Sequence, residues 1–114
     1  MNKSILIVDD NKSMTQTLAA ILRSKSLEVH AAFCGNEAIH VLENHSPNYL
    51  LTDVKMPDMN GLTLFQNARR LHPDLITFFM TAYASDTLLQ TGLAEGVRKV
   101  FIKPFDLEDL FLLL

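Results

Sequence analysis

Five short apolar runs alternate along the chain with segments that have helical spacing. The run from Ser4 to Val8 is typical, because it is apolar from Ile5 onwards and ends at two acidic residues. Continuous apolar runs of this length indicate strands that are buried on both faces of a parallel sheet. The sequence predicts such strands at residues 4–8, 27–33, 49–52, 75–80 and 97–102.

The segments between and after these runs place apolar residues three and four positions apart, as on one face of a helix. The first segment carries Met14, Leu18 and Leu22 at this spacing, and Asp10 or Asn11 is suited to cap it. The predicted helices cover residues 11–26, 35–44, 62–71, 85–93 and 106–114. Five strand–helix units with right-handed crossovers predict an α/β fold, a doubly wound parallel sheet with helices on both faces.

Composition limits the classes of function. The chain has 114 residues, of which 48% are hydrophobic and 20% are charged, as expected of one folded domain. Its net charge of −3 offers no basic surface, so direct nucleic-acid binding by this domain is not expected. The single cysteine, Cys34, forms no internal disulfide and favours a cytoplasmic location. Neither a signal peptide nor an apolar run near the ~20 residues of a membrane helix is visible, so no membrane association is expected.

Polar side chains follow four of the five predicted strands. They are Asp9 and Asp10 after the first strand, Asp53 after the third, Thr81 after the fourth and Lys103 after the fifth. Because parallel strands end at the same edge of a sheet, we expect these side chains to meet there. Clustered carboxylates repel one another unless a cation joins them. Oxygen ligands with room for water and phosphate favour Mg²⁺ over Ca²⁺.

Asp53 lies between the acid pair and the lysine, where a carboxylate is placed to be a nucleophile. Its attack on phosphorus would form an acyl phosphate, with the Lys103 ammonium and the Thr81 hydroxyl neutralising and positioning the phosphoryl group. Each residue also has an ordinary explanation. Asp53 could cap a turn, Asp9 and Asp10 could cap a helix, Thr81 could bond to the backbone, and Lys103 could be a solvated charge. Their convergence on one edge favours the chemical interpretation.

Four motifs at these strand ends resemble those of response-regulator receiver domains of two-component signalling. They are Ile7-Val8-Asp9-Asp10, Asp53-Val54-Lys55-Met56-Pro57-Asp58-Met59-Asn60-Gly61, Thr81-Ala82 and Lys103-Pro104-Phe105. The resemblance covers essentially the whole chain, so residues 1–114 are interpreted as one receiver domain, cut from a longer chain. It implies a flavodoxin-like sheet of five strands in the order 2-1-3-4-5.

The resemblance implies a phosphorelay switch and not a conventional enzyme. Asp53 would accept a phosphoryl group from a histidine kinase or a histidine phosphotransfer protein. Lys103 would pair with the phosphoryl oxygens, and Thr81 would turn its hydroxyl towards them. Small Ala82 would leave the pocket open, and the peptide bond before Pro104 would be cis.

The resemblance also implies a metal and a set of partners. Mg²⁺ would be bound directly by Asp10 and Asp53, through water by Asp9, and by the backbone carbonyl of Lys55. Phosphorylation would change the face built by the fourth helix, the fifth strand and the last helix. That face would control an effector domain or protein, or would join two copies of the chain as a homodimer.

One position departs from the family pattern. Similar domains carry Tyr or Phe three residues before the lysine, where this chain has Val100. Phe101 is adjacent, but strand alternation points it to the opposite face. The usual relay from the threonine to the aromatic ring is therefore in doubt. Tyr83, two residues after Thr81, is a candidate for part of that role and, with Lys55, for tuning water access and the lifetime of the adduct.

Two other functions stay open. Phosphatases with an aspartyl nucleophile use similar residues, but their nucleophile follows the first strand in an Asp-x-Asp arrangement, whereas Asp9 and Asp10 are adjacent. No cap insertion is visible either. A degenerate receiver, which binds partners without phosphate, is favoured only by Val100, since the pocket residues are complete. The sequence names neither the cognate kinase nor the output.

Overall fold

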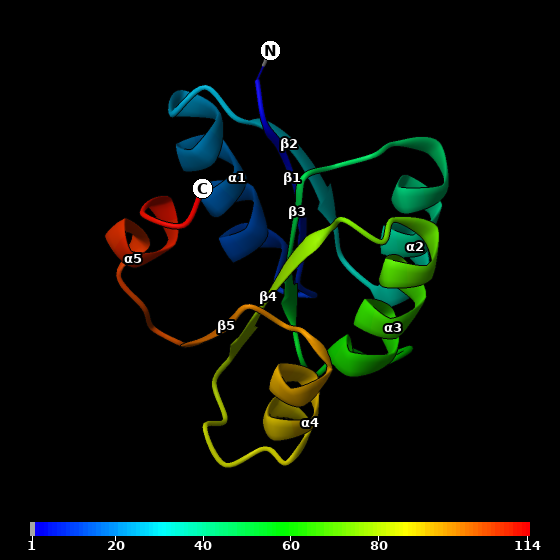
Figure 1. Ribbon diagram of the computed structural model, residues 1–114. Coiled ribbons are helices and arrows are strands. Elements are labelled where there is room, and N and C mark those ends of the chain that lie inside the picture. Colours follow the sequence, from blue (N-terminus) through cyan, green and yellow to red (C-terminus); the bar gives the residue numbers. More distant parts are fainter. Residues whose placement is uncertain (1) are drawn as a thin grey trace.

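The computed structural model of the chain describes residues 2–114, in which strands and helices alternate throughout (Figure 1). The strands are β1 (Ser4–Val8), β2 (Glu28–Ala32), β3 (Tyr49–Asp53), β4 (Ile76–Thr81) and β5 (Lys99–Ile102). The helices are α1 (Lys12–Ser24), α2 (Gly35–Asn44), α3 (Gly61–Leu71), α4 (Leu88–Glu95) and α5 (Leu107–Phe111). The strands pair in parallel in the order β2-β1-β3-β4-β5, which confirms the predicted fold.

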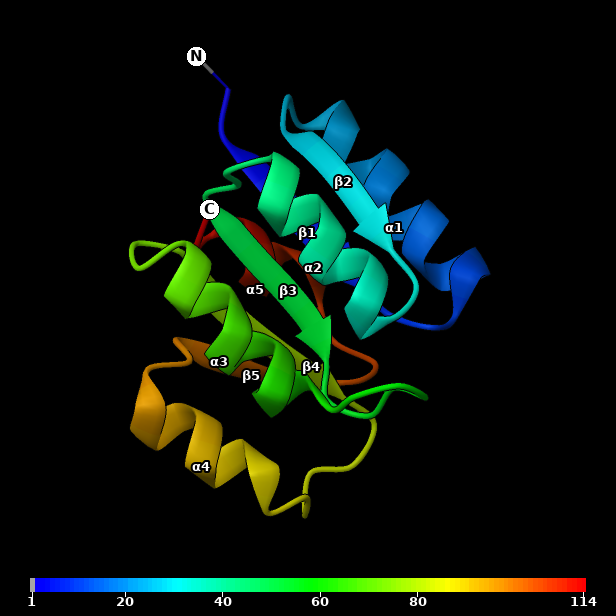
Figure 2. The same ribbon diagram turned by 90° about the vertical axis from the view of Figure 1, so that its right-hand side faces the viewer.

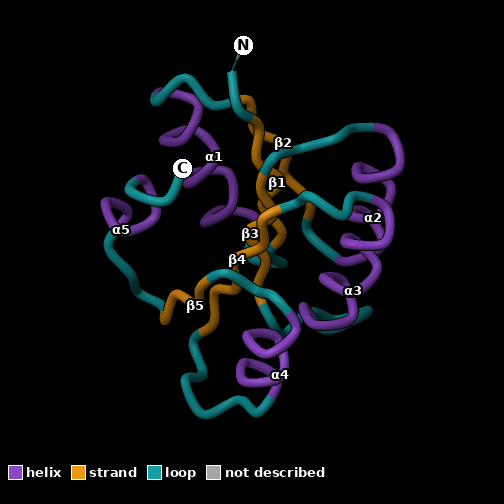
Figure 3. Tube along the Cα trace, viewed as in Figure 1, coloured by secondary structure: helices purple, strands orange, loops and turns teal. Residues whose placement is uncertain are grey.

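The helices form a layer on each side of this sheet. α1 and α5 cover one face and α2 and α3 the other, with α4 beside α3 (Figures 2 and 3). Strand side chains alternate between the two layers. Ile7 packs under α1 and α5, whereas its neighbour Leu6 packs under α2 and α3, and neither side chain is exposed. Within residues 2–114, no helix has both the length and the apolar character required to cross a bilayer.

Most boundaries differ from the sequence prediction by one to three residues, and loop contacts explain two of these differences. α4 begins at Leu88 and not at residue 85, since the Asp86 amide donates to the carbonyl of Tyr83 at 3.2 Å and forms a turn. β5 begins two residues later than predicted, because the amide of Val97 donates to Gly92 of α4 at 2.9 Å. α5 ends at Phe111, and the last residues of the chain form turns.

Candidate functional site

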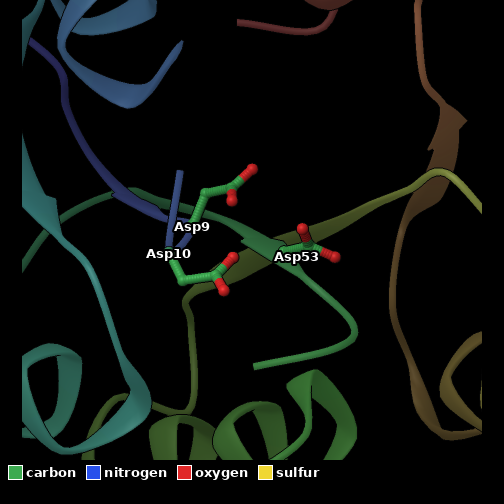
Figure 4. Close-up of side chains that lie close together, drawn as sticks. All are labelled: Asp9, Asp10 and Asp53. Carbon is green, nitrogen blue, oxygen red and sulfur yellow. The ribbon is translucent and has the colours of Figure 1, made fainter. Parts of the chain in front are cut away.

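Three aspartates meet at the carboxyl edge of the sheet (Figure 4). Strand register brings them together: Val8 of β1 pairs with Thr52 of β3, so Asp9 follows beside Asp53, the last residue of β3. One carboxylate oxygen from each of Asp9, Asp10 and Asp53 lies within 4.8 Å of the others. Asp9 is buried, Asp53 is half-buried and Asp10 is exposed, so the cluster opens to solvent on one side.

Lys103 enters this cluster from the loop after β5. Its ammonium lies 2.6 Å from Oδ2 of Asp9 and 2.8 Å from Oδ2 of Asp53. Burial by itself would lower the pKa of Lys103, but the hydrogen bonds and the charges of Asp53 and Asp9 outweigh it and raise the pKa. The lysine is therefore a fixed positive charge between two carboxylates. The Lys103–Pro104 peptide bond is cis.

Backbone amides hold the second oxygen of each paired carboxylate. Oδ1 of Asp9 accepts from the amide of Asn11 at 3.0 Å, and Oδ1 of Asp53 accepts from the amide of Lys55 at 3.2 Å. Gly61, the first residue of α3, passes so close that a Cβ there would lie 2.6 Å from the carbonyl oxygen of Asp53. The chain is thus built tightly around the base of the Asp53 side chain.

Thr81 is fully buried at the end of β4 and lies next to Asp53 in register, because Asp53 pairs with Met80. Its hydroxyl oxygen accepts a hydrogen bond from the amide of Tyr83 at 3.0 Å. This contact is the ordinary arrangement of a strand-end hydroxyl. The following residue, Ala82, is small and exposed, so no bulky side chain stands at that position.

The side chain of Lys55 leaves the cluster and crosses to the loop after β4. Its ammonium lies 4.6 Å from the centroid of the Tyr83 ring and 4.0 Å from Oδ2 of Asp86. Lys55 is largely exposed, whereas the Asp86 side chain is only 10% exposed. Sequence analysis did not find Asp86, since nothing local distinguishes it from any acid that precedes a helix.

Val100 occupies the position where similar domains carry an aromatic residue. It is half-buried and packs in the cluster around Phe79 on the α4 side of the sheet. Phe101 lies on the opposite face, where its ring contacts Phe78 and Phe105 at centroid distances of 6.0 and 4.9 Å. The alternation predicted for these two residues is confirmed, and no aromatic ring replaces the missing one within β5.

Asp58 is a second residue that sequence analysis did not single out. Its carboxylate accepts from the amides of Gly35 and Asn36 at 3.0 and 2.8 Å. These residues start α2, whose own N-cap, Cys34, makes no side-chain cap. Although its slight burial acts to raise the pKa of Asp58, the backbone hydrogen bonds lower it overall. The loop after β3 is thereby fixed to α2.

An apolar groove of about 580 Å³ runs beside the cluster, between α1 and the segment after β5. α1 contributes Met14, Thr17 and Ile21, and the other walls include Ala82, Lys103 and Phe105. Because Lys103 belongs both to the groove and to the acidic cluster, the groove leads to the edge of the candidate site.

Comparisons with known proteins agree with this geometry. Residues 5–114 match the family model of the response regulator receiver domain. A response regulator receiver protein of Anaeromyxobacter sp. (strain Fw109-5) is 38% identical over 99 residues, which are 87% of this chain and 42% of that protein. The chain spans less than half the length of several curated relatives that it matches.

Solved structures show the same fold. A response regulator receiver domain protein from Methanospirillum hungatei JF-1 has a TM-score of 0.92 at 33% identity, over 97% of this chain and 89% of that one. The response regulator protein TrrA from Thermotoga maritima, solved in complex with Mg²⁺ and BeF, has a TM-score of 0.84 at 25% identity. That match covers 96% of this chain and 93% of the other.

Proposed function

Because the chain belongs to the response regulator receiver domain family, we propose that it is a phosphorelay switch in which Asp53 accepts the phosphoryl group. The contrast among the three acids supports this choice. The Asp9 side chain is only 1% exposed, and Asp10 forms no ion pair with Lys103, whereas Asp53 is half-buried and pairs with Lys103. Asp53 therefore combines access for a donor with a cation that neutralises the incoming charge.

The acid cluster suits a magnesium ion. Its donors are carboxylate oxygens within 4.8 Å of one another, which are the hard ligands that Mg²⁺ prefers. Asp10 and Asp53 would bind the ion directly, Asp9 through water, and Lys55 through its backbone carbonyl. Bound there, the ion would supply charge neutralisation for phosphoryl transfer.

Two further side chains complete the proposed phosphoryl site. Lys103 keeps its positive charge at all physiological pH values, because its pKa is raised, and it would hold the phosphoryl oxygens against Asp53. Thr81 would donate its hydroxyl hydrogen to a phosphoryl oxygen, and in turning to do so its oxygen would leave the amide of Tyr83, which donates to it in this structure. That movement would link occupancy of the pocket to the loop after β4.

The donor would be a histidine kinase or a histidine phosphotransfer protein, docked over the apolar groove. A phosphohistidine must come within bonding distance of Asp53, and the groove is the apolar surface that adjoins the cluster through Lys103. Contact with α1 would then align the donor imidazole with the carboxylate.

The output would be a change in the face formed by α4, β5 and α5. Leu93 on α4 and Ile102 on β5 are each 41% exposed, although both are large and apolar. We assign this face to an effector domain or protein, or to a second copy of the chain. The chain covers only part of its longer relatives. The effector would therefore be set by the protein in which this domain acts.

Labelling with a small phosphodonor tests the proposal. Incubation with acetyl phosphate and Mg²⁺ should add the mass of one phosphoryl group, in an adduct that alkali removes. The Asp53→Asn variant should stay unlabelled, and Asp74→Asn, which changes an exposed acid elsewhere, should be labelled normally. No adduct on the folded wild-type chain would favour the phosphate-independent receiver that Val100 suggests. Sustained turnover of phosphate esters would instead favour a phosphatase.

A further inference from the structure

The loop after β3 is held at two points, and each point lies at the start of a helix. Asp58 accepts two backbone hydrogen bonds from the first residues of α2. Lys55 reaches in the other direction, to Asp86 just before α4. The loop that carries the neighbours of Asp53 therefore bridges two helix N-termini.

The two attachments differ in strength. The Asp58 carboxylate uses both oxygens, at 3.0 and 2.8 Å, and charge-assisted bonds to backbone amides are among the stronger hydrogen bonds. The Lys55 ammonium is held by a single ion pair of 4.0 Å and by the face of the Tyr83 ring at 4.6 Å. The pair is long and its lysine side is exposed to solvent, so it contributes little and breaks readily. The Lys55 end is thus the one that can be released.

A continuous series of contacts joins this weak end to the acidic pocket. The amide of Lys55 donates to Asp53, and its ammonium lies over the Tyr83 ring. The amide of Tyr83 donates to the Thr81 hydroxyl at 3.0 Å. A phosphoryl group on Asp53 replaces the single negative charge of the carboxylate by nearly two, a net gain of about one negative charge, and this added charge competes with Asp86 for the Lys55 ammonium. If Thr81 turns to that group, Tyr83 also loses its acceptor.

On the other side, the contacts lead into α4. Oδ2 of Asp86 faces Lys55, while Oδ1 accepts from the amide of Leu88, the first residue of the helix, at 3.0 Å. The carbonyl of Asp86 also accepts from the amide of Leu89 at 3.2 Å. The position of Asp86 therefore sets the first turn of α4. Val100, packed nearby, is too small to supply an aromatic relay.

We infer that Lys55, Tyr83 and Asp86 form an inter-loop latch that carries the state of the Asp53 pocket to α4. The latch is closed in this structure, and a phosphoryl group on Asp53 opens it by drawing away the Lys55 ammonium and the Thr81 hydroxyl. Lys55 and Asp86 are then positioning residues for the switch. They take over the role of the aromatic residue that similar domains carry at the position of Val100. The inference rests on phosphorylation of Asp53, as proposed above.

Amide hydrogen exchange at Leu88 and Leu89 tests the latch, with the variants Lys55→Met and Asp86→Asn. Lys55 is exposed, and asparagine keeps an oxygen for the Leu88 amide, so both variants should fold. Without phosphate, the two amides should exchange about two- to fivefold faster than in the wild type, as expected for the loss of one weak ion pair. The double variant should equal either single variant, because both break the same contact.

Beryllofluoride with Mg²⁺, a phosphoryl mimic, provides the second arm. It should speed exchange at Leu88 and Leu89 in the wild type and change it little in either variant. Lys25→Met is the matched control, because the Lys25 ammonium lies 5.4 Å from the ring centroid of Phe111, far from both loops. This variant should respond to beryllofluoride as the wild type does. Tyr83→Leu, which removes only the ring, repeats the test should Asp86→Asn disturb α4.

The outcomes separate the latch from the phosphorylation itself. Variants that accept phosphate from acetyl phosphate and respond to the mimic as fully as the wild type would overturn the latch alone. Additive effects in the double variant would show that Lys55 and Asp86 act separately, and would also overturn it. A wild-type chain that takes up no phosphoryl group would overturn the proposed function and the coupling together.

Discussion

Lys103 Nζ lies 2.8 Å from Oδ2 of Asp53, so the proposed phosphoacceptor is paired with a cation before any donor arrives. The same ammonium contacts Asp9, which has almost no exposure to water. A buried carboxylate that loses its counter-charge is costly, because water cannot replace the lost partner. Lys103 therefore has a structural role in addition to the role proposed for it in phosphoryl binding.

Replacing Lys103 by Met should lower the free energy of unfolding by about 3 kcal/mol in the absence of Mg²⁺. Mg²⁺ should restore part of this loss, since a divalent ion neutralises the same carboxylates. Urea denaturation with and without Mg²⁺ measures both effects, with Lys25→Met as the control. Equal stability of the variant and the wild type without Mg²⁺ would contradict the structural role.

The difference in free energy of unfolding between the wild type and Lys103→Met should depend on pH with a defined sign. The folded-state pKa of Lys103 is raised above its ordinary value of 10.5, so its contribution is fully present below that pH. The gap in stability between the wild type and Lys103→Met should stay constant between about pH 6 and 9. It should narrow only as the pH rises through the raised pKa.

Removal of the Asp10 carboxylate should weaken Mg²⁺ binding without disturbing the fold. Asp10 is exposed, yet one of its oxygens lies within 4.8 Å of the other two acids. In Asp10→Asn, Mg²⁺ affinity measured by titration calorimetry should fall at least about tenfold, since even outer-shell partners of a metal contribute that much. Asp74→Asn serves as the control. Unchanged affinity in Asp10→Asn would place the ion elsewhere.

The Thr81 hydroxyl should be dispensable for labelling and needed for switching. Thr81→Ala should accept phosphate from acetyl phosphate, because Asp53 and Lys103 are intact. Its α4 amides should lose most of their response to beryllofluoride, a coupling of about 1 kcal/mol or roughly fivefold. Thr81→Ser keeps the hydroxyl and should restore the response. A full response in the alanine variant would exclude this role.

The sequence predicted the acidic cluster correctly because the relevant pattern is local. A buried parallel strand has a continuous apolar sequence, and the residue after it lies at the carboxyl edge of the sheet, independently of the sequence elsewhere in the chain. Asp9 and Asp53 could therefore be placed together from the ends of two runs. The same reasoning predicted that Val100 and Phe101 face opposite sides of the sheet.

The loop contacts could not be predicted because they depend on tertiary structure. Asp58 accepts from the amide of Gly35 at the start of α2, 23 positions earlier in the chain, and Asp86 pairs with Lys55 across two loops. No periodicity in the sequence carries that information, since loops have no repeat. The late start of α4 has the same cause, because Asp86 forms a turn where helical spacing alone predicted a helix.

A charge placed in the apolar groove should block a protein donor but not a small one. Thr17 lines the groove and is exposed, so Thr17→Arg should fold normally. Transfer from a phosphorylated histidine phosphotransfer protein should slow about tenfold, as for a moderate interface residue. Labelling by acetyl phosphate should be unchanged. Ala20→Arg, on α1 but outside the groove lining, is the control; equal slowing there would point to a general charge effect.

The stacked rings of His30 and His45, with centroids 4.4 Å apart, should make stability depend on pH. Burial lowers the pKa of His30, and the charges of His45 and Arg23 lower it further, against an opposite effect of Glu28. The unfolded chain then binds more protons, so stability should fall as the pH drops below about 6.5 and level off below the lowered pKa. In His45→Gln the His30 pKa, measured by NMR titration of the ring, should rise towards its ordinary value, and the fall in stability should become shallower. As a control, replacing the exposed His40 by Gln should change neither the pKa of His30 nor the pH dependence of stability. An unchanged His30 titration in His45→Gln would contradict the proposed effect of His45 on His30.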